Sequence, residues 1–504
     1  MGVINEMVKY SRETKMENII TDLIQTIICT GINPNRMNIG RVIPIIKNNQ
    51  LSNEMLSNIR PITISDTMSN ILEKYLLEKI NIDSKDNKFQ FGFTSKSSTQ
   101  HALYTFKETV SYYLKNRGRI YACAIDASKA FDKVWRIGLF QKMIDKINWK
   151  YWRALYDYYD KSLIYIELNG EITEEIKING GVKQGGPLSP KLYNTYVKSL
   201  IKRIEEINMG ARIGNVKISI LVYADDIMLV SPVKIGIAKM LIKTQEYMEE
   251  WKIKINLDKT NYIQFGRQKI IDYELIVNEI KINRVKTMKY LGMTFDEKLN
   301  FNEHVKERTK KCMKAVYGLH AIGLLSRSMD LETKQYIYKT YCRPVLTYGF
   351  DIINVNEKEE KKIRTDEAIL LKRILNVKKT SKNTLMYQTM KIREPIYNIY
   401  KMKSSLYNRL QQNIVTKSLT NALIIEQMNS KTNILENTLI EEMTELTNAL
   451  NIKTMKKKEI EKKFKIIEKE EYPQGLIDSI KYCINKRYED NKIEKTLNLL
   501  IKGY

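Results

Sequence analysis

The stretch Leu221-Val-Tyr-Ala-Asp-Asp-Ile-Met-Leu-Val230 places two adjacent acids between two apolar runs. Apolar runs on both sides of a short turn are typical of a β-hairpin, and we expect strand, tight turn and strand over 216–231. Asp225 and Asp226 would then lie at the hairpin tip. Taken alone, an Asp-Asp pair in a turn is more often ordinary turn chemistry, because Asp side chains hydrogen-bond to nearby backbone groups.

A third acid ends another apolar run. Residues 119–125 indicate a buried strand that stops at Asp126. Carboxylates from separate strand ends can hold two divalent ions about 3.5–4 Å apart, which stabilise the attacking and leaving oxygens of an in-line displacement at phosphorus. Magnesium prefers such hard oxygen ligands. We therefore expect Asp126 and Asp225 as direct ligands of two Mg²⁺ ions, with Mn²⁺ as an alternative, and Asp226 as a weaker or supporting ligand.

The segment between these acids combines a glycine turn with a helix. Apolar residues spaced three and four apart predict a helix over 190–207, with Ser189 as its cap and Pro190 in its first turn. Gln184, Gly185 and Gly186 stand just before it, where the absence of Cβ atoms lets a backbone approach a ligand closely. A simple turn is the equal alternative on these residues alone.

Composition narrows the class of partner. The formal charge of +26 over 504 residues points to a polyanion, with nucleic acid as the first candidate. No apolar run could span a bilayer and Met1–Met16 lacks the apolar core of a signal peptide, so we expect an intracellular protein with no membrane partner. The five cysteines are scattered, without a C-x-x-C pair, and are expected to be reduced core residues.

Three segments together are far more specific than any one of them. They are Ala124-Ile-Asp-Ala-Ser-Lys-Ala-Phe-Asp-Lys-Val-Trp135, Gly181-Val-Lys-Gln-Gly-Gly-Pro-Leu-Ser-Pro190 and the hairpin stretch 221–230. In order and spacing they resemble the A, B and C motifs of reverse transcriptases. The resemblance is greatest to non-LTR, LINE-type retrotransposons and covers roughly residues 20–400.

Further segments resemble other parts of that family. Residues 41–47, Asn58-Ile-Arg-Pro-Ile62 and Gln90-Phe-Gly-Phe-Thr-Ser-Lys-Ser-Ser-Thr99 are similar to its fingers, Asn256-Leu-Asp-Lys-Thr260 to its D motif, and Tyr341-Cys-Arg-Pro-Val-Leu-Thr-Tyr-Gly349 to its thumb. Lys289-Tyr-Leu-Gly292 is similar to its primer-grip hairpin, which makes Tyr290, Leu291 and Gly292 the expected primer grip.

The resemblance implies roles for five residues. Phe131 would crowd the sugar of the incoming nucleotide and exclude a 2′ hydroxyl, although a core Phe is the favoured reading without the family. Gln184 and Gly185 would lie against the nascent base pair and incoming nucleotide. Arg60, held extended by the following proline, would contact the triphosphate, and Lys259 would protonate the pyrophosphate leaving group.

Two regions depart from the family pattern. The sequence shows no nuclease-sized N-terminal domain or C-terminal metal finger, so it is expected to be truncated or divergent and to depend on a separate endonuclease. Residues 401–504 match nothing that can be named and are expected to be a helical accessory to the thumb. Within them, Lys453–Lys465 fits a solvated helix face better than a nuclear address, although a nuclear location is expected for an element of this type.

The sequence therefore predicts an α+β right-hand polymerase. The expected parts are fingers with an N-terminal extension over 1–118, a palm over 119–298, a helical thumb over 299–400, beginning with a basic amphipathic helix over 302–319, and the accessory region. The expected reaction is RNA-templated extension of a DNA or RNA primer with dNTPs. A degenerate or domesticated copy that only binds RNA is the alternative, and an RNA-dependent RNA polymerase is disfavoured by Phe131.

Overall fold

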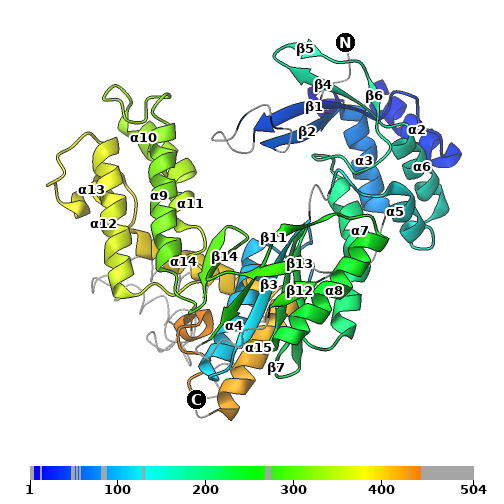
Figure 1. Cartoon of the computed structure of the whole chain (residues 1–504). Coiled ribbons are helices and arrows are strands. Elements are labelled where there is room, and N and C mark those ends of the chain that lie inside the picture. The colour runs from blue at the N-terminus through cyan, green and yellow to red at the C-terminus, as the bar shows by residue number, and fades with distance from the viewer. Residues whose placement is uncertain are drawn as a thin grey trace, which may run out of the picture.

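The computed structural model describes residues 5–11, 14–46, 52, 55, 58–80, 88–127, 131–266, 274–277, 280–430 and 432–443. Figure 1 shows three parts: a small sheet with helices at the upper right, a larger sheet with helices below, and a helical arm at the upper left. Mixed sheets and helices in this arrangement confirm the predicted α+β class.

The small sheet has the strand order β2-β1-β4-β5, with β6 paired to β4. Its part of the chain comprises α1 (Asn5–Lys9), α2 (Lys15–Thr30), β1 (Ile39–Ile46), β2 (Ile59–Ser65), α3 (Thr67–Lys79), α5 (Arg136–Met143), α6 (Trp149–Asp160), β4 (Leu163–Leu168), β5 (Glu171–Ile172) and β6 (Ile176–Lys177). Because β1 pairs antiparallel with β2 and parallel with β4, a segment beyond residue 160 completes a sheet that begins at residue 39. The fingers are thus not one continuous range, and the predicted boundary at 118 divides elements that pack together.

Pro44 lies inside β1, opposite Pro61 of β2. A proline cannot donate to a ladder, which is why the sequence predicts a sheet edge or a loop here. The strand is interior, so that prediction is wrong for β1 as a whole. Its pairing with β4 covers residues 39–42, however, and Pro44 falls past the end of that pairing.

The larger sheet has the order β12-β13-β11-β3-β10-β9. This part comprises α4 (Thr99–Lys115), β3 (Ile120–Ala127), α7 (Ser189–Glu206), β7 (Ala211–Ile213), β8 (Val216–Ile218), β9 (Ile220–Tyr223), β10 (Asp226–Ser231), α8 (Lys234–Glu250), β11 (Ile255–Phe265), β12 (Leu275–Val277), β13 (Ile280–Arg284), β14 (Thr287–Tyr290) and β15 (Met293–Asp296). Strand β3 is apolar because it lies between β10 and β11 in the sheet and packs against α4 and α8.

Helix α4 was expected in the fingers, but its core contacts are with the larger sheet. The Phe106 ring meets the rings of Phe265, Tyr290 and Phe295 edge to face, with centroids 6.0, 5.6 and 5.0 Å away. Such aromatic clusters bury large apolar areas and fix ring orientations. Helix α4 therefore holds the β14–β15 hairpin against the palm.

The rest of the described chain is helical, as the sequence predicts beyond residue 300. It comprises α9 (Asn302–Gly318), α10 (Leu331–Ile337), the π-helix η2 (Tyr338–Cys342), α11 (Arg343–Thr347), α12 (Glu357–Ile374), α13 (Asn383–Thr389), α14 (Pro395–Leu410) and α15 (Ile414–Asn429). Helix α14 runs through the predicted boundary at 400. Helix α15 packs on α4, where the hydroxyls of Tyr104 and Thr420 lie 2.9 Å apart.

Residues 401–504 are expected to be a helical accessory to the thumb, and this is wrong for α15, which packs on α4, β7 and β8 of the palm. Residues 444–504, including Lys453–Lys465, are outside the described residues.

The exposure of the cysteines differs in part from the expectation. Cys123, Cys312 and Cys342 are buried as expected, whereas Cys29 on α2 is exposed and corrects that expectation; Cys483 lies outside the described residues. Among the described residues, no helix combines the length and the apolar character that crossing a membrane requires.

Candidate active site

The three predicted acids come together at one edge of the larger sheet. Strand β10 pairs antiparallel with β3 in a register that sets Asp226 opposite Asp126. Strand β9 pairs with β10 so that Tyr223 and Asp226 close the hairpin, which leaves Ala224 and Asp225 as its two-residue turn. Two acids thus face each other across a ladder and the third lies at the adjoining tip.

The turn is held in an unusual backbone conformation. Ala224 has a φ of 56°, in the left-handed region that a two-residue hairpin requires at its first central position and that a side chain disfavours. The buried Gln90 side chain stabilises it, since its Oε1 accepts hydrogen bonds from the N–H groups of Ala224 (3.1 Å) and Gly92 (2.9 Å). Backbone N–H groups of Phe91 and Val222 donate to Val222 and Phe89 oxygens, which ties this segment along β9.

Gly92 is required where it stands. A Cβ atom there would lie 2.5 Å from the Ala224 nitrogen and 3.0 Å from the Tyr223 carbonyl carbon. The segment therefore lies closer to the acidic turn than it could with a residue other than glycine at position 92.

The acids influence one another electrostatically. Burial raises the pKa of Asp226 to about 6, with further increases from the Asp225 and Asp126 charges. Burial also raises the pKa of Asp225, Asp126 raises it further, and the Arg60 guanidinium opposes the shift. Both carboxylates reach solvent, yet the surrounding protein disfavours their charged forms.

These residues suit a divalent ion by donor chemistry, although they are not gathered tightly. Within the described part of the chain, no group of three or more His, Cys, Asp or Glu side chains is arranged closely enough to hold a metal as it stands. The donors are hard carboxylate oxygens. Burial, and after it the charges of the neighbouring acids, disfavour the charged forms of Asp225 and Asp226, and a bound cation would stabilise those forms. The donor set therefore fits the expected group.

Lys259 reaches this edge from a bulge. The pairing of β11 with β3 is regular from Asn261 onward and resumes at Asn256 opposite Asp126, with a register shift between them. A bulge redirects the side chains it carries. Lys259 Nζ lies 3.8 Å from Asp126 Oδ2 while its side chain is 71% exposed, so the pair contributes little to stability but places an ammonium group beside the acids.

Phe131 is half-buried and has aromatic neighbours. Its ring stacks on Tyr193 of α7 with centroids 4.7 Å apart and planes 18° apart, and Phe93 meets it edge to face at 6.4 Å. Burial raises the pKa of Tyr193, and the charges of Asp225 and Asp226 raise it further, so Tyr193 lies close to both acids. Phe131 is thus a supported ring beside the acids rather than an isolated core residue.

The Gln184 loop is fixed from two sides. The Gln184 side-chain amide donates to Asp132 Oδ1 at 2.7 Å, and the Gln184 carbonyl accepts from the Thr63 N–H of β2 at 2.9 Å. Gly185 has a φ of 116°, and a Cβ there would lie 2.7 Å from the Thr63 oxygen. The close approach that the glycine permits is therefore to the fingers backbone.

The predicted Ser189 cap is wrong. Helix α7 begins at Ser189, and the residue before it makes no capping bond through its side chain, whereas Pro190 lies in the first turn as expected. The fully buried Glu73 of α3 supplies the missing acceptor, since its Oε2 accepts from the Leu188 N–H at 3.2 Å and its Oε1 from the Tyr158 hydroxyl at 2.7 Å. A side chain distant in sequence thus satisfies the helix start.

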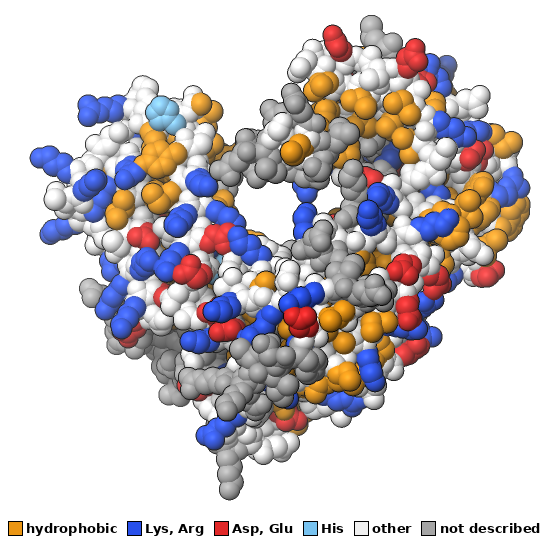
Figure 2. All heavy atoms as spheres, viewed as in Figure 1, with side chains coloured by type: hydrophobic (Ala, Val, Ile, Leu, Met, Phe, Trp, Pro, Cys, Tyr) orange, Lys and Arg blue, Asp and Glu red, His pale blue; other side chains and the backbone are white. Residues whose placement is uncertain are grey.

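Arg60 is exposed on β2 and lies close enough to act on Asp225. Arg60 lies on the fingers and the acids lie on the palm. The guanidinium group of Arg60 therefore approaches the carboxylates from a second part of the molecule. Figure 2 shows an opening between the helical arm and the fingers, above the larger sheet.

The predicted primer grip is the β14–β15 turn. Tyr290 pairs with Met293, and the two turn residues Leu291 and Gly292 have φ values of 44° and 78°, the pattern of a type I′ hairpin. The Tyr348 hydroxyl donates to the Leu291 oxygen at 2.6 Å. Tyr290 itself is 4% exposed and packs on Phe106, so it supports the turn from beneath instead of presenting its ring.

Sequence reasoning missed four residues at this site: Gln90, Gly92, Glu73 and Tyr193. Gln90 and Gly92 lie in a segment that was singled out only for its resemblance to the fingers. An acid among mostly apolar residues over 71–77 was the available signal for Glu73, and Tyr193 lies on the apolar face that predicts the helix over 190–207.

The fold and the candidate site together define the class of protein. A palm sheet with acids at a hairpin tip, approached by a fingers strand and flanked by a helical arm, is that of a right-hand nucleic-acid polymerase. Residues 45–295 match the model of the reverse transcriptase (RNA-dependent DNA polymerase) family. The chain belongs to this family, and its curated relatives are of the non-LTR retrotransposon type.

Two proteins from Drosophila melanogaster are among the relatives of this chain. The RNA-directed DNA polymerase from mobile element jockey is 23% identical over 70% of this chain and 39% of its own length. The probable RNA-directed DNA polymerase from transposon X-element is 24% identical over 71% and 40%. The chain thus spans about two fifths of these relatives.

Among solved structures, apo telomerase from Candida tropicalis is similar, with 12% identity, a TM-score of 0.40 and coverage of 89% of this chain and 74% of that one.

Proposed function

We propose that this chain is an RNA-directed DNA polymerase that extends a primer 3′ hydroxyl with dNTPs. The observation that carries the proposal is the register of β3, β10 and β9, which sets Asp126 opposite Asp226 and puts Asp225 at the adjoining tip. Family membership supports it, as does the similarity to the RNA-directed DNA polymerases of jockey and X-element.

The metal we propose is Mg²⁺, with Mn²⁺ as a substitute. Membership of the reverse transcriptase family implies dependence on divalent ions in general. Asp126 and Asp225 would hold two ions, with Asp226 supporting them, and the bound ions would stabilise the attacking and leaving oxygens. Burial raises the pKa of Asp225 and Asp226 and the neighbouring acids raise it further, and a bound cation would offset both effects, which supports this assignment.

The chain's own residues would position the nucleotide and move a proton. Arg60 would grip triphosphate oxygens with its planar guanidinium. Phe131, backed by Tyr193, would exclude a 2′ hydroxyl, and Gln184 with Gly185 would border the nascent base pair. Lys259 would donate a proton to the pyrophosphate oxygen that leaves.

The partners we propose are an RNA template, a DNA or RNA primer and dNTPs, with a separate endonuclease as a source of primer ends in the nucleus. The net charge of +26 supports a nucleic-acid partner.

Primer extension tests the proposal. Purified chain given poly(rA), oligo(dT), Mg²⁺ and dTTP should extend the primer, and Asp225→Ala should abolish extension while leaving RNA affinity nearly unchanged. Inactivity of the intact chain across several templates and both metals, with RNA binding retained, would favour a protein that only binds RNA.

Discrimination between deoxynucleotides and ribonucleotides tests the role of Phe131 separately. Phe131→Ala should admit ribonucleotides, because removing the ring opens the space that a 2′ hydroxyl would occupy. Phe131→Tyr keeps the ring and should keep the discrimination. Equal discrimination in all three proteins would remove this role from Phe131.

A further inference from the structure

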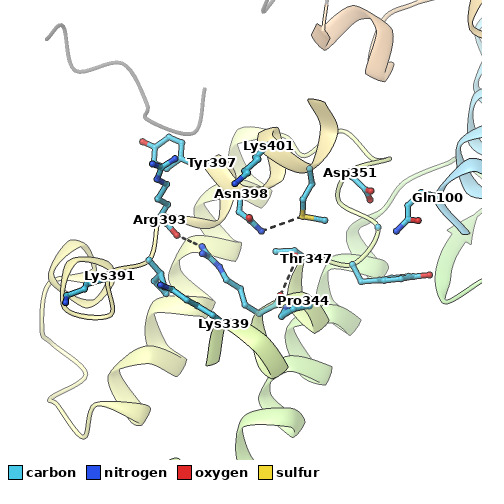
Figure 3. A pocket seen from close by; sticks show the side chains of 15 residues that line it. Gln100, Lys339, Pro344, Thr347, Asp351, Lys391, Arg393, Tyr397, Asn398 and Lys401 are labelled. Carbon is cyan, nitrogen blue, oxygen red and sulfur yellow. Dashed lines mark hydrogen bonds between the residues drawn. The ribbon is translucent and has the colours of Figure 1, made fainter. Parts of the chain in front are cut away.

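A cavity of about 650 Å³ lies between η2, α11 and α14, away from the three acids. Figure 3 shows side chains from several elements turned around it. Its wall is formed by the start of α4, by η2 and α11, by the segment after α13 and by α14. A volume of this size is typical of a site for a small molecule or one unit of a polymer.

The cavity has a strong excess of positive charge. Its cations are Lys339, Arg343, Lys391, Arg393 and Lys401, against a single carboxyl group, that of Asp351. Arg343 is compensated, since its Nε lies 3.0 Å from Glu367. Within the described ranges, the three lysines form no ion pair. Like charges repel, so the charged forms of these lysines are more stable when an anion binds between them.

Two of these lysines, Lys339 and Lys391, are close enough for their charges to interact. Burial lowers the pKa of Lys339, and the charges of Arg343 and Lys391 lower it further. Lys339 comes from η2 and Lys391 from the segment after α13, so the repulsion acts between separate elements. An anion placed between them would be bound by more than one element at once.

The remaining lining is suited to a nucleobase. Tyr348 and Tyr397 contribute rings from two sides, and Gln100 and Asn398 contribute side-chain amides that can both donate and accept hydrogen bonds. Aromatic rings interleaved with cations are the chemistry of sites for single-stranded nucleic acid, since rings stack on bases while cations contact phosphates. A simple phosphate site has no need of the rings.

The cavity is also connected to the candidate active site. Tyr348 lines it and donates its hydroxyl hydrogen to the Leu291 oxygen in the predicted primer-grip turn. Arg308 of α9 lies over the same ring, 5.2 Å from its centroid. A strand that occupied the cavity would therefore contact the element that carries the turn.

We propose that this cavity binds a nucleotide of single-stranded RNA, with the two phosphates that flank it on Lys339, Lys391 and Lys401 and its base on Tyr397. This site lies outside the polymerase centre and anchors RNA on the helical arm. The proposal rests on the proposed function only in taking RNA as the partner, since it requires no chemistry at the acids.

RNA affinity without dNTPs tests it. A fluorescent single-stranded RNA is titrated with the full chain and with Lys339→Ala/Lys391→Ala/Lys401→Ala, and anisotropy is read over a range of salt. The variant should bind about tenfold more weakly or worse, with a salt slope shallower by about 1.4, because contacts to two phosphates of about 0.7 each are lost. The matched control is Lys150→Ala/Lys202→Ala/Lys239→Ala, which removes three exposed lysines on α6, α7 and α8 and should bind as the wild type does.

A second pair of variants tests the base contact. Tyr397→Ala should weaken RNA binding by about tenfold, and Tyr397→Phe should restore it, since stacking needs only the ring. Competition with free nucleoside monophosphates and inorganic phosphate distinguishes the other sources of the same chemistry.

Four outcomes would overturn the proposal: unchanged RNA affinity in the triple variant, an equal loss in the control, identical binding by Tyr397→Ala and the wild type, or displacement of the RNA by micromolar free nucleotide or phosphate. Primer extension plays no part in these readings, so an inactive polymerase would leave the result interpretable.

Discussion

Substituting Gly92 by alanine should move the acidic turn without touching an acid. The added Cβ would lie 2.5 Å from the Ala224 nitrogen, whereas ordinary contact begins near 3.4 Å. The turn or the 89–94 segment must therefore shift by about 1 Å. Since the neighbouring atoms are backbone and the Gln90 amide oxygen, no flexible side-chain end can absorb the change. Overpacking of this kind costs about 1–3 kcal/mol of unfolding free energy.

The effect on catalysis should exceed the effect on stability. A displacement of about 1 Å in a catalytic group can lower the rate by about 100-fold. Single-turnover incorporation of dTMP on poly(rA)/oligo(dT) measures that rate, and urea denaturation measures the free energy of unfolding. Gln90→Leu should act in the same direction, because it removes the acceptor of the Ala224 and Gly92 N–H groups.

The matched control for this prediction is Gly318→Ala. Nothing lies within 4 Å of a Cβ at that position in α9, so stability should be unchanged or raised by up to about 1 kcal/mol and the rate should not change. A Gly92→Ala chain that is folded and incorporates dTMP at the wild-type rate would refute the reasoning, since the turn would then not depend on that contact.

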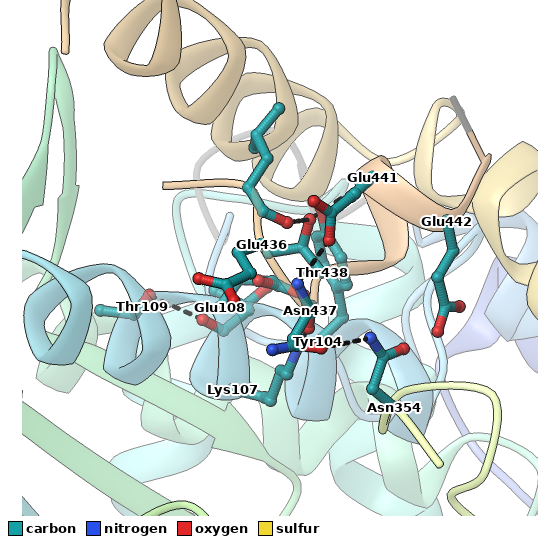
Figure 4. A network of polar contacts seen from close by, with 12 residues as sticks. Tyr104, Lys107, Glu108, Thr109, Asn354, Glu436, Asn437, Thr438, Glu441 and Glu442 are labelled. Carbon is teal, nitrogen blue, oxygen red and sulfur yellow. Dashed lines mark hydrogen bonds and ion pairs between the residues drawn. The ribbon is translucent and has the colours of Figure 1, made fainter. Parts of the chain in front are cut away.

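Three further predictions concern the proton donor, a buried ion pair and a buried carboxyl group. Lys259→Ala should slow single-turnover incorporation by about 100-fold with RNA affinity unchanged, whereas an equal rate would remove its role as a proton donor. Figure 4 shows the polar network around Lys107 and Glu108 of α4, whose side chains are almost fully buried, with Lys107 Nζ 2.9 Å from Glu108 Oε1. Glu108→Ala would leave a buried charge unpaired and should lower the unfolding free energy by about 3–5 kcal/mol in urea titrations. A loss under 1 kcal/mol would contradict this. Burial raises the pKa of Asp351 to about 6 from 3.8, so its contribution to stability is complete below about pH 4 and is lost as pH rises through about 6; Asp351→Asn should flatten that part of the pH profile and stabilise the chain at pH 7.

Local patterns predicted the individual elements well. The hairpin over 216–231, the strand that ends at Asp126 and the helix over 302–319 correspond to β8–β10, β3 and α9. Each depends on hydrophobic periodicity and on short-range turn or breaker signals, which a single sequence contains. The acids were predictable because strand ends and a turn placed them, although their pairing across β3 and β10 needed the fold.

Long-range pairing set the limit of prediction. Nothing local shows that β4 joins β1 in parallel or that α15 packs on α4, and both facts cut across the predicted contiguous ranges. The Ser189 cap failed for the same reason, because Glu73 on another helix takes the capping role. Gln90 needed the structure too, since a glutamine in an apolar segment does not reveal which backbone groups it accepts from.

The most direct test of the central claim is the rate of a single dTMP incorporation on poly(rA)/oligo(dT) in Mg²⁺, compared between the wild type and Asp126→Asn at saturating template. Asparagine keeps the shape of the side chain and removes its charge. If the acids at the edge of β3 and β10 hold the catalytic ions, the rate should fall by about 1,000-fold while template affinity stays within about twofold. Equal rates in the two proteins would contradict the account.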